Sequence, residues 1–316
     1  MKNPTRRSAL ALAAVAALAL TGCGSSDPLG GGDTASGSPS ATGGTGGAGG
    51  GDALVIGSQQ YYSNEIIAEL YAQALESEGY TVEREYQIGQ REVYLPEVES
   101  GAIDVMPEYG GNLLQYYDAE ATATSPADIQ AALAEVLPQG LRPLEPAEAT
   151  DQDSYNVTRQ FAEKHSLTSL ADLKDVDEPL KVAANSEFET RPYGPAGLKE
   201  AYGVDVTVVP VEDSGGPLTV KALVDGDVQL ADIYSADPSI QTKDLVTLED
   251  PENLILPQNV TPIVSDAVDE QAAAVIEEVN AKLTAEALIG LNRQSVEDEA
   301  SSADIAREWL AGQGLS

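Results

Sequence analysis

Two tyrosines occupy equivalent places in two similar stretches of the chain, and their rings could bind a cation. Residues 101–109 read GAIDVMPEY and residues 226–234 read GDVQLADIY, so each stretch runs from a glycine to a tyrosine. Apolar residues alternate along both, which is typical of a short strand. The face of a tyrosine ring attracts cations, and its hydroxyl forms hydrogen bonds. We therefore expect Tyr109 and Tyr234 to end two equivalent strands.

The elements that must position these tyrosines also occur twice. Helical patterns at 92–100 and 217–225 precede the two tyrosine strands, and strand-like runs at 54–58 and 180–184 lie further upstream. The order strand, helix, strand, helix, strand is typical of open α/β sheets, which bind ligands at the carboxyl ends of their strands. The pattern predicts two similar α/β lobes with a cleft between them and a tyrosine on each wall.

The boundaries of the lobes follow from changes in the pattern. It changes around 150–159, where we place the crossing into the second lobe, and 259–264 is the expected return. The prediction is a first lobe of residues 53–157 plus 260–316, with the C-terminal helices packed on it, and a second lobe of 158–259. Each lobe is long enough for its own core. Two crossings make a hinge, which is typical of closure around a ligand.

The N-terminus is similar to a secretion signal followed by a lipid attachment site. Three basic residues precede an unbroken apolar run at 9–20, which is too short to span a bilayer. The run closes on LTGC, similar to a bacterial lipobox, and Cys23 is the only cysteine. We expect a signal peptide at 1–22, then lipidated Cys23 and a Gly/Ser-rich tether to residue 52. The protein would then lie lipid-anchored on the extracytoplasmic face of the cell membrane; an ordinary signal peptide with a chance cysteine is the alternative.

Charge excludes some functions. The chain has 52 acidic and 17 basic side chains, for a net charge of −35. Such a field excludes nucleic-acid binding and attracts cationic ligands, although solubility or adaptation to salt explains it equally simply. The only histidine, His165, lies in a polar helical stretch, and no Asp-rich loop has calcium-ligand spacing. We therefore expect a protein that is not an enzyme and has no metal or cofactor.

Six short motifs follow one another in an order that is similar to a known family. They are GSQQ at 57–60, PEYGGN at 107–112, DSY at 153–155, NSEFETRP at 185–192, DSGGPL at 213–218 and ADIYSAD at 231–237. This order resembles the substrate-binding lipoproteins of ABC importers for glycine betaine, choline, carnitine and related quaternary amines. The resemblance implies an α/β, two-lobed type II periplasmic-binding-protein fold with hinge crossovers, and membrane permease subunits as partners.

The resemblance also implies a cage for the quaternary ammonium group. Its positions here are Tyr109, Tyr155 and Tyr234, with the backbone carbonyl of Asp153 as a further contact. A quaternary ammonium cannot donate a hydrogen bond, and each desolvated ring contributes about 0.5–2 kcal/mol to its binding. We also expect Tyr61 or its neighbour Tyr62 either to cover the pocket or to pack on the surface.

The other end of the ligand would meet polar side chains. Arg191 matches the family's carboxylate-binding arginine, with a surface ion pair as the alternative, and Asn112 stands where a threonine is common. Two positions depart from the family: Gln59 replaces a usual lysine and Gln258 a usual tyrosine. We therefore expect the trimethylammonium group to be kept and the tail to differ, so that choline, carnitine or ergothioneine is as plausible as glycine betaine.

Two other functions remain open at this stage. The same fold could bind an amino acid, because Asp213, Asp232 and Asp237 lie near the motifs and suit a primary ammonium. A surface sensor or adhesin is the third reading, for which the sequence offers no positive signal.

Overall fold

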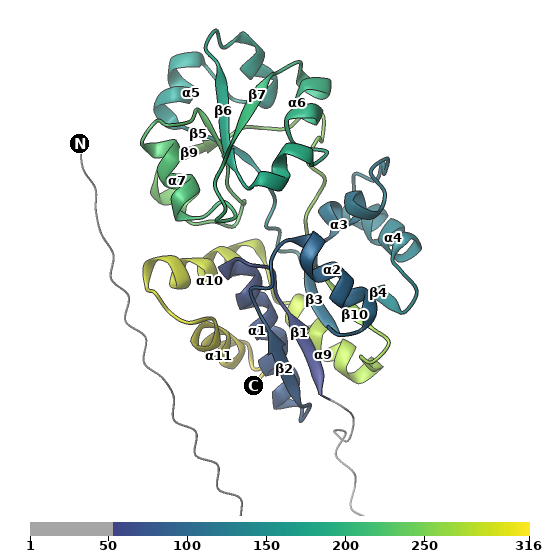
Figure 1. Cartoon of the computed structure of the whole chain (residues 1–316). Coiled ribbons are helices and arrows are strands. Elements are labelled where there is room, and N and C mark those ends of the chain that lie inside the picture. The colour runs from purple at the N-terminus through teal and green to yellow at the C-terminus, as the bar shows by residue number, and fades with distance from the viewer. Residues whose placement is uncertain (1–52) are drawn as a thin grey trace, which may run out of the picture. The chain divides into compact units, whose positions relative to one another are not determined.

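The computed structural model describes residues 53–316, so the expected signal peptide, Cys23 and the tether lie outside the described residues. The described chain forms two α/β lobes, each built on a five-stranded sheet (Figure 1). The strand orders are β2-β1-β3-β10-β4 in the first sheet and β7-β6-β8-β5-β9 in the second.

The first lobe combines the N-terminal and C-terminal parts of the described chain. Its strands are β1 (Leu54–Gly57), β2 (Val82–Glu85), β3 (Val105–Tyr109), β4 (Leu141–Pro143) and β10 (Val260–Ser265). Its helices are α1 (Tyr62–Ser77), α2 (Arg91–Ser100), α3 (Gly110–Tyr117), α4 (Pro126–Val136), α9 (Glu270–Asn280), α10 (Ala285–Glu297) and α11 (Ser302–Gln313).

The second lobe is continuous in sequence. Its strands are β5 (Tyr155–Thr158), β6 (Leu180–Ala184), β7 (Val206–Pro210), β8 (Leu230–Asp232) and β9 (Leu245–Thr247). Its helices are α5 (Arg159–His165), α6 (Pro195–Tyr202), α7 (Pro217–Val224) and α8 (Ser239–Thr242), with two 3-10 helices, η1 (Leu170–Asp175) and η2 (Ser186–Thr190).

The internal repeat and the two-lobed α/β fold are confirmed. The order β1-α1-β2-α2-β3 in one lobe corresponds to β6-α6-β7-α7-β8 in the other, and these strands are parallel. The fourth strand of each sheet is antiparallel and comes from the far side of a crossing: β10 follows the second lobe, and β5 follows the first. Because β5 begins at Tyr155, the second sheet starts ahead of the expected boundary at 158.

The two crossings lie side by side. Thr150 and Asn259 form an isolated antiparallel bridge, and the side-chain amide of Asn259 donates to the carbonyl of Ala147 at 2.9 Å. The segments that connect the lobes are therefore joined to each other at the base of the cleft.

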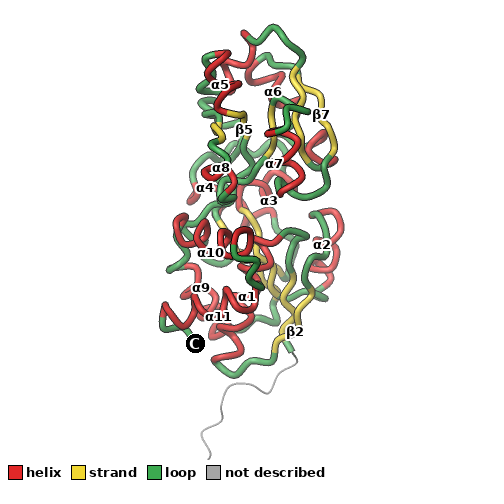
Figure 2. Tube along the Cα trace, turned by 90° about the vertical axis from the view of Figure 1, so that its left-hand side faces the viewer, coloured by secondary structure: helices red, strands yellow, loops and turns green. Residues whose placement is uncertain are grey.

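The three C-terminal helices pack on the first lobe, as predicted. Helices α9, α10 and α11 each contact α1, and one hydrophobic cluster holds them together (Figure 2). Ser301 caps α11, because its hydroxyl accepts the backbone N–H of Asp304. Helix α1 begins after Tyr61 with no side-chain cap, because Asn64 turns to the preceding loop and accepts the N–H of Gln59 at 2.8 Å.

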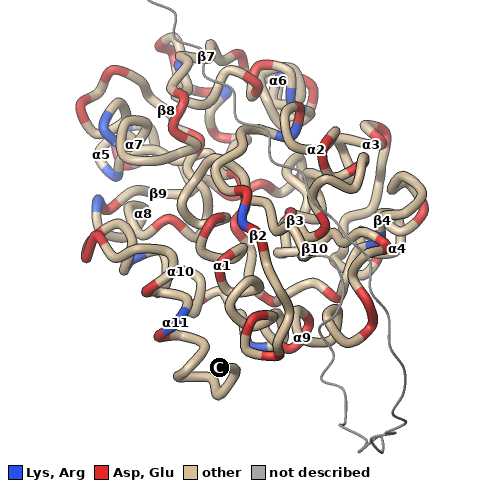
Figure 3. The backbone as a smooth tube through the Cα atoms, turned by 60° about the horizontal axis from the view of Figure 1, so that its bottom comes forward, with Lys and Arg blue, Asp and Glu red and all other residues tan. Residues whose placement is uncertain are grey.

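Acidic side chains are spread over both lobes (Figure 3). None of the helices within residues 53–316 combines the length and the apolar character that a membrane span needs.

A buried tyrosine hydroxyl in the first lobe provides a test of the packing. Tyr71 in α1 is fully buried and donates to Oδ1 of Asn280 in α9. The variant Tyr71→Phe should lower the free energy of unfolding by about 1–3 kcal/mol, because it leaves a buried amide oxygen without a donor. Tyr80→Phe is the control, since the hydroxyl of Tyr80 bonds Asp269 at the surface. Equal losses of unfolding free energy for the two variants in urea would contradict a buried hydrogen bond between Tyr71 and Asn280.

Candidate functional site

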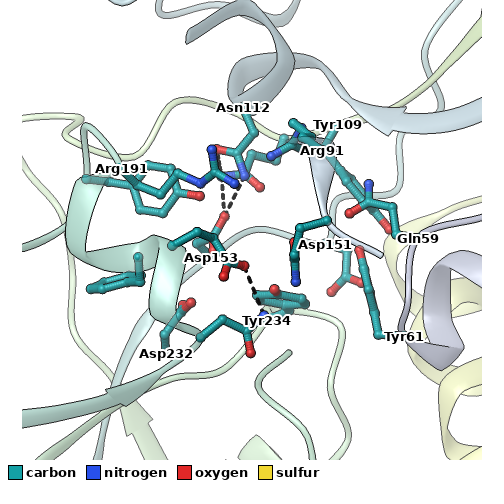
Figure 4. A pocket seen from close by; sticks show the side chains of 16 residues that line it. Gln59, Tyr61, Arg91, Tyr109, Asn112, Asp151, Asp153, Arg191, Asp232 and Tyr234 are labelled. Atoms are coloured by element: carbon teal, nitrogen blue, oxygen red, sulfur yellow. Dashed lines mark hydrogen bonds between the residues drawn. The ribbon is translucent and has the colours of Figure 1, made fainter. Parts of the chain in front are cut away.

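A pocket lies where the two lobes and the crossing segments meet (Figure 4). Its cavity volume is about 30 Å³, and the figure rises to about 420 Å³ when the space open to solvent is included. Its walls come from the ends of β3 and β8, from the loops after β1 and β6, and from both crossings. Strand ends from both sheets therefore converge on one cavity, as the sequence pattern predicts.

Three tyrosines form one aromatic cluster in this pocket. Tyr61 and Tyr109 of the first lobe stack with ring centroids 6.4 Å apart, and Tyr61 meets the ring of Tyr234 edge-on at 5.1 Å. Tyr109 ends β3, whereas Tyr234 lies just beyond β8. Tyr61 is 8% exposed and lines the pocket, which answers the question that the sequence left open for it. The two lobes thus contribute rings to a shared wall.

Tyr155 lies behind the pocket wall rather than in it. Its ring packs edge-on against Phe188 at 5.6 Å, and its hydroxyl donates to the carbonyl of Tyr193 at 2.8 Å. Phe188 and Tyr193 are the residues that line the pocket here. Sequence reasoning missed both, although they lie in and next to the motif at 185–192 from which Arg191 was chosen. Their aromatic type was the available signal.

Asp153 presents its side chain to the pocket and gathers two of the predicted tail residues. Its Oδ2 accepts the side-chain amides of Asn112 at 2.6 Å and of Gln258 at 3.0 Å. Gln258 also donates to Oδ1 of Asn112 at 2.8 Å. All three residues line the pocket and are buried. The amide donors expected to meet a ligand tail are therefore already bonded to a carboxylate.

Three further carboxyl groups line the pocket: those of Asp151 and Glu187, which were not predicted, and that of Asp232, which was weighed only for a primary ammonium. Asp151 is 3% exposed; its Oδ1 accepts the N–H of Ala236 at 3.1 Å, and its Oδ2 has no partner among the described residues. Burial raises the pKa of Asp151 from the usual 3.8 to about 7. Burial and the charge of Asp153 raise the pKa of Asp232 well above its usual range. Desolvation penalises the charged forms, and neither Asp151 nor Asp232 forms an ion pair with a Lys or Arg of residues 53–316.

The two arginines of the pocket are both paired with glutamates. Arg91 bonds the fully buried Glu108 at 2.8 Å, and Tyr94 and the backbone N–H of Tyr109 donate to the same carboxylate. Arg191 lines the pocket from the second lobe and bonds Glu92 of α2 at 2.9 Å, so this ion pair joins the lobes. Arg191 is therefore both a pocket residue and one half of an ion pair.

Gln59 lines the pocket next to the aromatic cluster. It is 5% exposed, and its Nε2 has no partner among the described residues. Nearby, Gln60 donates to Ser214 at 3.1 Å and Tyr62 donates to Asp237 at 2.8 Å, both across the cleft. Asp237 therefore joins the second lobe to the first through this hydrogen bond.

Asp213 has a structural contact of its own. It accepts N–H groups at the start of α7. Of the three aspartates weighed for a primary ammonium, only Asp232 lines the pocket. Among residues 53–316, no group of His, Cys, Asp and Glu is arranged to hold a metal ion. The arrangement suits a small cation held by ring faces and carboxylates.

Comparison with known sequences identifies related proteins. A family model described as the substrate binding domain of ABC-type glycine betaine transport system matches residues 52–312. The glycine betaine-binding protein YehZ of Escherichia coli K12 is 27% identical over 275 residues, which cover 82% of this chain and 90% of YehZ.

Solved structures share the fold. A glycine betaine/carnitine/choline ABC transporter structure superposes with a TM-score of 0.67 at 20% identity, covering 83% of this chain and 99% of the other. Apo YehZ from Escherichia coli superposes with a TM-score of 0.60 at 25% identity, covering 84% and 100%.

The buried carboxyl of Asp151 makes the stability of the ligand-free protein depend on pH. Its pKa is about 7 in the folded protein and 3.8 ordinarily, so the folded state holds this proton more tightly. Between these values the contribution of Asp151 to stability falls as pH rises, by up to about 1.4 kcal/mol per pH unit. Asp151→Asn should remove this slope, so its stability relative to the wild type should grow from pH 4 to pH 7. Urea unfolding at several pH values measures the difference in unfolding free energy between the variant and the wild type. A difference that is independent of pH would contradict the raised pKa of Asp151.

Proposed function

This chain belongs to the family of substrate-binding domains of ABC-type glycine betaine transport systems, and on that premise we propose that its pocket captures a quaternary ammonium solute for a membrane permease. The family consists of transporter components rather than enzymes. Glycine betaine, choline, carnitine and related betaines are the candidate solutes.

The observation that carries the proposal is the tyrosine cluster shared by the two lobes. Tyr61 and Tyr109 come from one lobe and Tyr234 from the other, so closing the cleft completes the wall. A quaternary ammonium has no N–H, so ring faces and nearby carboxylates are its natural partners. Three rings at about 0.5–2 kcal/mol each supply a large part of the roughly 8 kcal/mol of a micromolar affinity.

The remaining polar residues would position the rest of the ligand. We assign Arg191, Gln59, Asn112 and Gln258 to the tail, because all four line the pocket. Tyr155 would act through its contacts with Phe188 and Tyr193 rather than by touching the ligand.

A second candidate ligand is an amino acid, whose ammonium group is primary or secondary, or ergothioneine, a larger betaine with N–H groups in its ring. The carboxyl groups of Asp151, Asp153 and Asp232 in the lining favour it, because they could accept hydrogen bonds from N–H groups.

Titration calorimetry with purified protein tests the cage. Glycine betaine, choline, carnitine, ergothioneine and proline are the probes, and at least one trimethylammonium compound should bind in the micromolar range. Tyr109→Ala and Tyr234→Ala should each weaken that binding about 3- to 30-fold, because each removes one ring face. Tyr116→Ala, at an exposed ring outside the pocket, is the control. Binding of proline alone would refute the cage. Equal affinities of wild type, Tyr109→Ala and Tyr234→Ala for the trimethylammonium compound would refute it too.

The location of the protein is part of the proposal. A signal peptide at 1–22, lipid on Cys23 and a Gly/Ser-rich tether to residue 52 would hold the two lobes at the extracytoplasmic face of the cell membrane. In cells, Cys23→Ser should move the protein from the membrane fraction to the soluble fraction. Unchanged membrane association of this variant would argue against the lipid anchor.

A further inference from the structure

We propose that this pocket, given the function proposed above, selects solutes of net positive charge that carry a neutral hydroxyl, such as a quaternary ammonium alcohol, over zwitterionic betaines. We further propose that Asp151 is the residue that sets this preference. The inference rests on the charge balance of the lining and on the two polar atoms in it that lack partners.

The charge balance of the lining is negative. Its two cations, Arg91 and Arg191, are each paired with a glutamate, Glu108 and Glu92. Four other lining carboxyl groups have no ion pair with Lys or Arg among the described residues: Asp151, Asp153, Asp232 and Glu187. A ligand carboxylate would add a further negative charge to this cavity, whereas a net cation reduces the excess.

Most of the donors that could bind a ligand carboxylate already donate hydrogen bonds to carboxylates of the protein. The side-chain amides of Asn112 and Gln258 both bond Asp153. The arginines keep one nitrogen each outside their ion pairs, Nη1 of Arg91 and Nε of Arg191, among the described residues. These nitrogens can donate a hydrogen bond, but their positive charge is already balanced by a glutamate.

Two buried polar atoms of the lining have no hydrogen-bond partner among residues 53–316, and they are of the two types, donor and acceptor, that a hydroxyl group can bond. Nε2 of Gln59 is a donor, and Oδ2 of Asp151 is an acceptor. Both residues line the pocket beside the aromatic cluster around Tyr61 (Figure 4). A hydroxyl both donates and accepts, whereas an ionised carboxylate only accepts and would leave Oδ2 of Asp151 without a donor. An ammonium group against the rings with a hydroxyl tail would therefore satisfy the charge and both orphaned atoms.

The surroundings of Asp151 make this preference depend on pH. The ionisable groups facing it are the carboxyls of Asp153 and Asp237 and the phenols of Tyr61, Tyr62 and Tyr109. Burial first, and then these two carboxylates, raise the pKa of Asp151 to about 7. A quaternary ammonium keeps its charge at every pH, so protonation of the protein alone changes its binding. Binding of the cation to ionised Asp151 should thus weaken below pH 7, by up to about tenfold per pH unit.

The experiment compares choline with glycine betaine, which share the trimethylammonium group and differ in the tail. Calorimetric titrations of wild-type protein and Asp151→Asn are run at pH 5.5, 7.0 and 8.5. For the wild type at pH 8.5 we expect choline to bind at least about 10-fold more tightly than glycine betaine, and this ratio to shrink at pH 5.5. Asp151→Asn should weaken choline about 10-fold at pH 8.5 and leave little pH dependence. Asp227→Asn removes an exposed carboxylate far from the lining residues and should match the wild type.

The outcomes separate this inference from the proposed function. Tighter binding of glycine betaine than of choline at pH 8.5, or an equal loss of both ligands in Asp151→Asn, overturns the inference while the proposed function stands. Failure of folded wild-type protein to bind any quaternary amine overturns both. The wild-type pH profile is decisive even if the variant does not fold, because a choline-to-betaine ratio that is constant from pH 5.5 to 8.5 contradicts the role of Asp151.

Discussion

Desolvation of carboxyl groups is the constraint on which the pocket depends. Asp151, Asp153 and Asp232 line one cavity, and burial disfavours the ionised forms of Asp151 and Asp232. Asp153 is stabilised by two side-chain amides and Asp232 by the backbone N–H of Ser154, whereas one oxygen of Asp151 is left without a donor. In the proposed function a bound cation would offset this desolvation, and part of the affinity would come from that effect.

The same constraint explains why the carboxyl groups sit at the crossings. Each sheet takes its antiparallel fourth strand from the chain beyond a crossing, β10 in one lobe and β5 in the other. Asp151 and Asp153 immediately precede β5, so they lie where the chain passes between the lobes. The carboxyl groups and the rings of Tyr109 and Tyr234 therefore meet at the place where the two lobes are joined.

Contacts across the cleft add to this link. Arg191 pairs with Glu92, Gln60 with Ser214, and Tyr62 with Asp237, and each pair joins the two lobes. Because Arg191 is paired with Glu92, its positive charge is already balanced in this structure. The other carboxyl groups of the lining leave the pocket with a negative balance, which would favour a positively charged solute.

The sequence by itself determined the repeated α/β pattern, the two lobes, the C-terminal helices on the first lobe and the places of Tyr109 and Tyr234, because these follow from local periodicity and from strand ends. Only the tertiary structure decided which neighbouring side chains face the cavity. Tyr155 begins β5, and its register opposite Asp232 turns its ring toward Phe188, so that Tyr193 lines the pocket instead. The pairing of Arg91 with Glu108 and the missing partner of Asp151 likewise depend on residues distant in the chain. Burial and hydrogen bonding are set by three-dimensional neighbours, which periodicity does not encode.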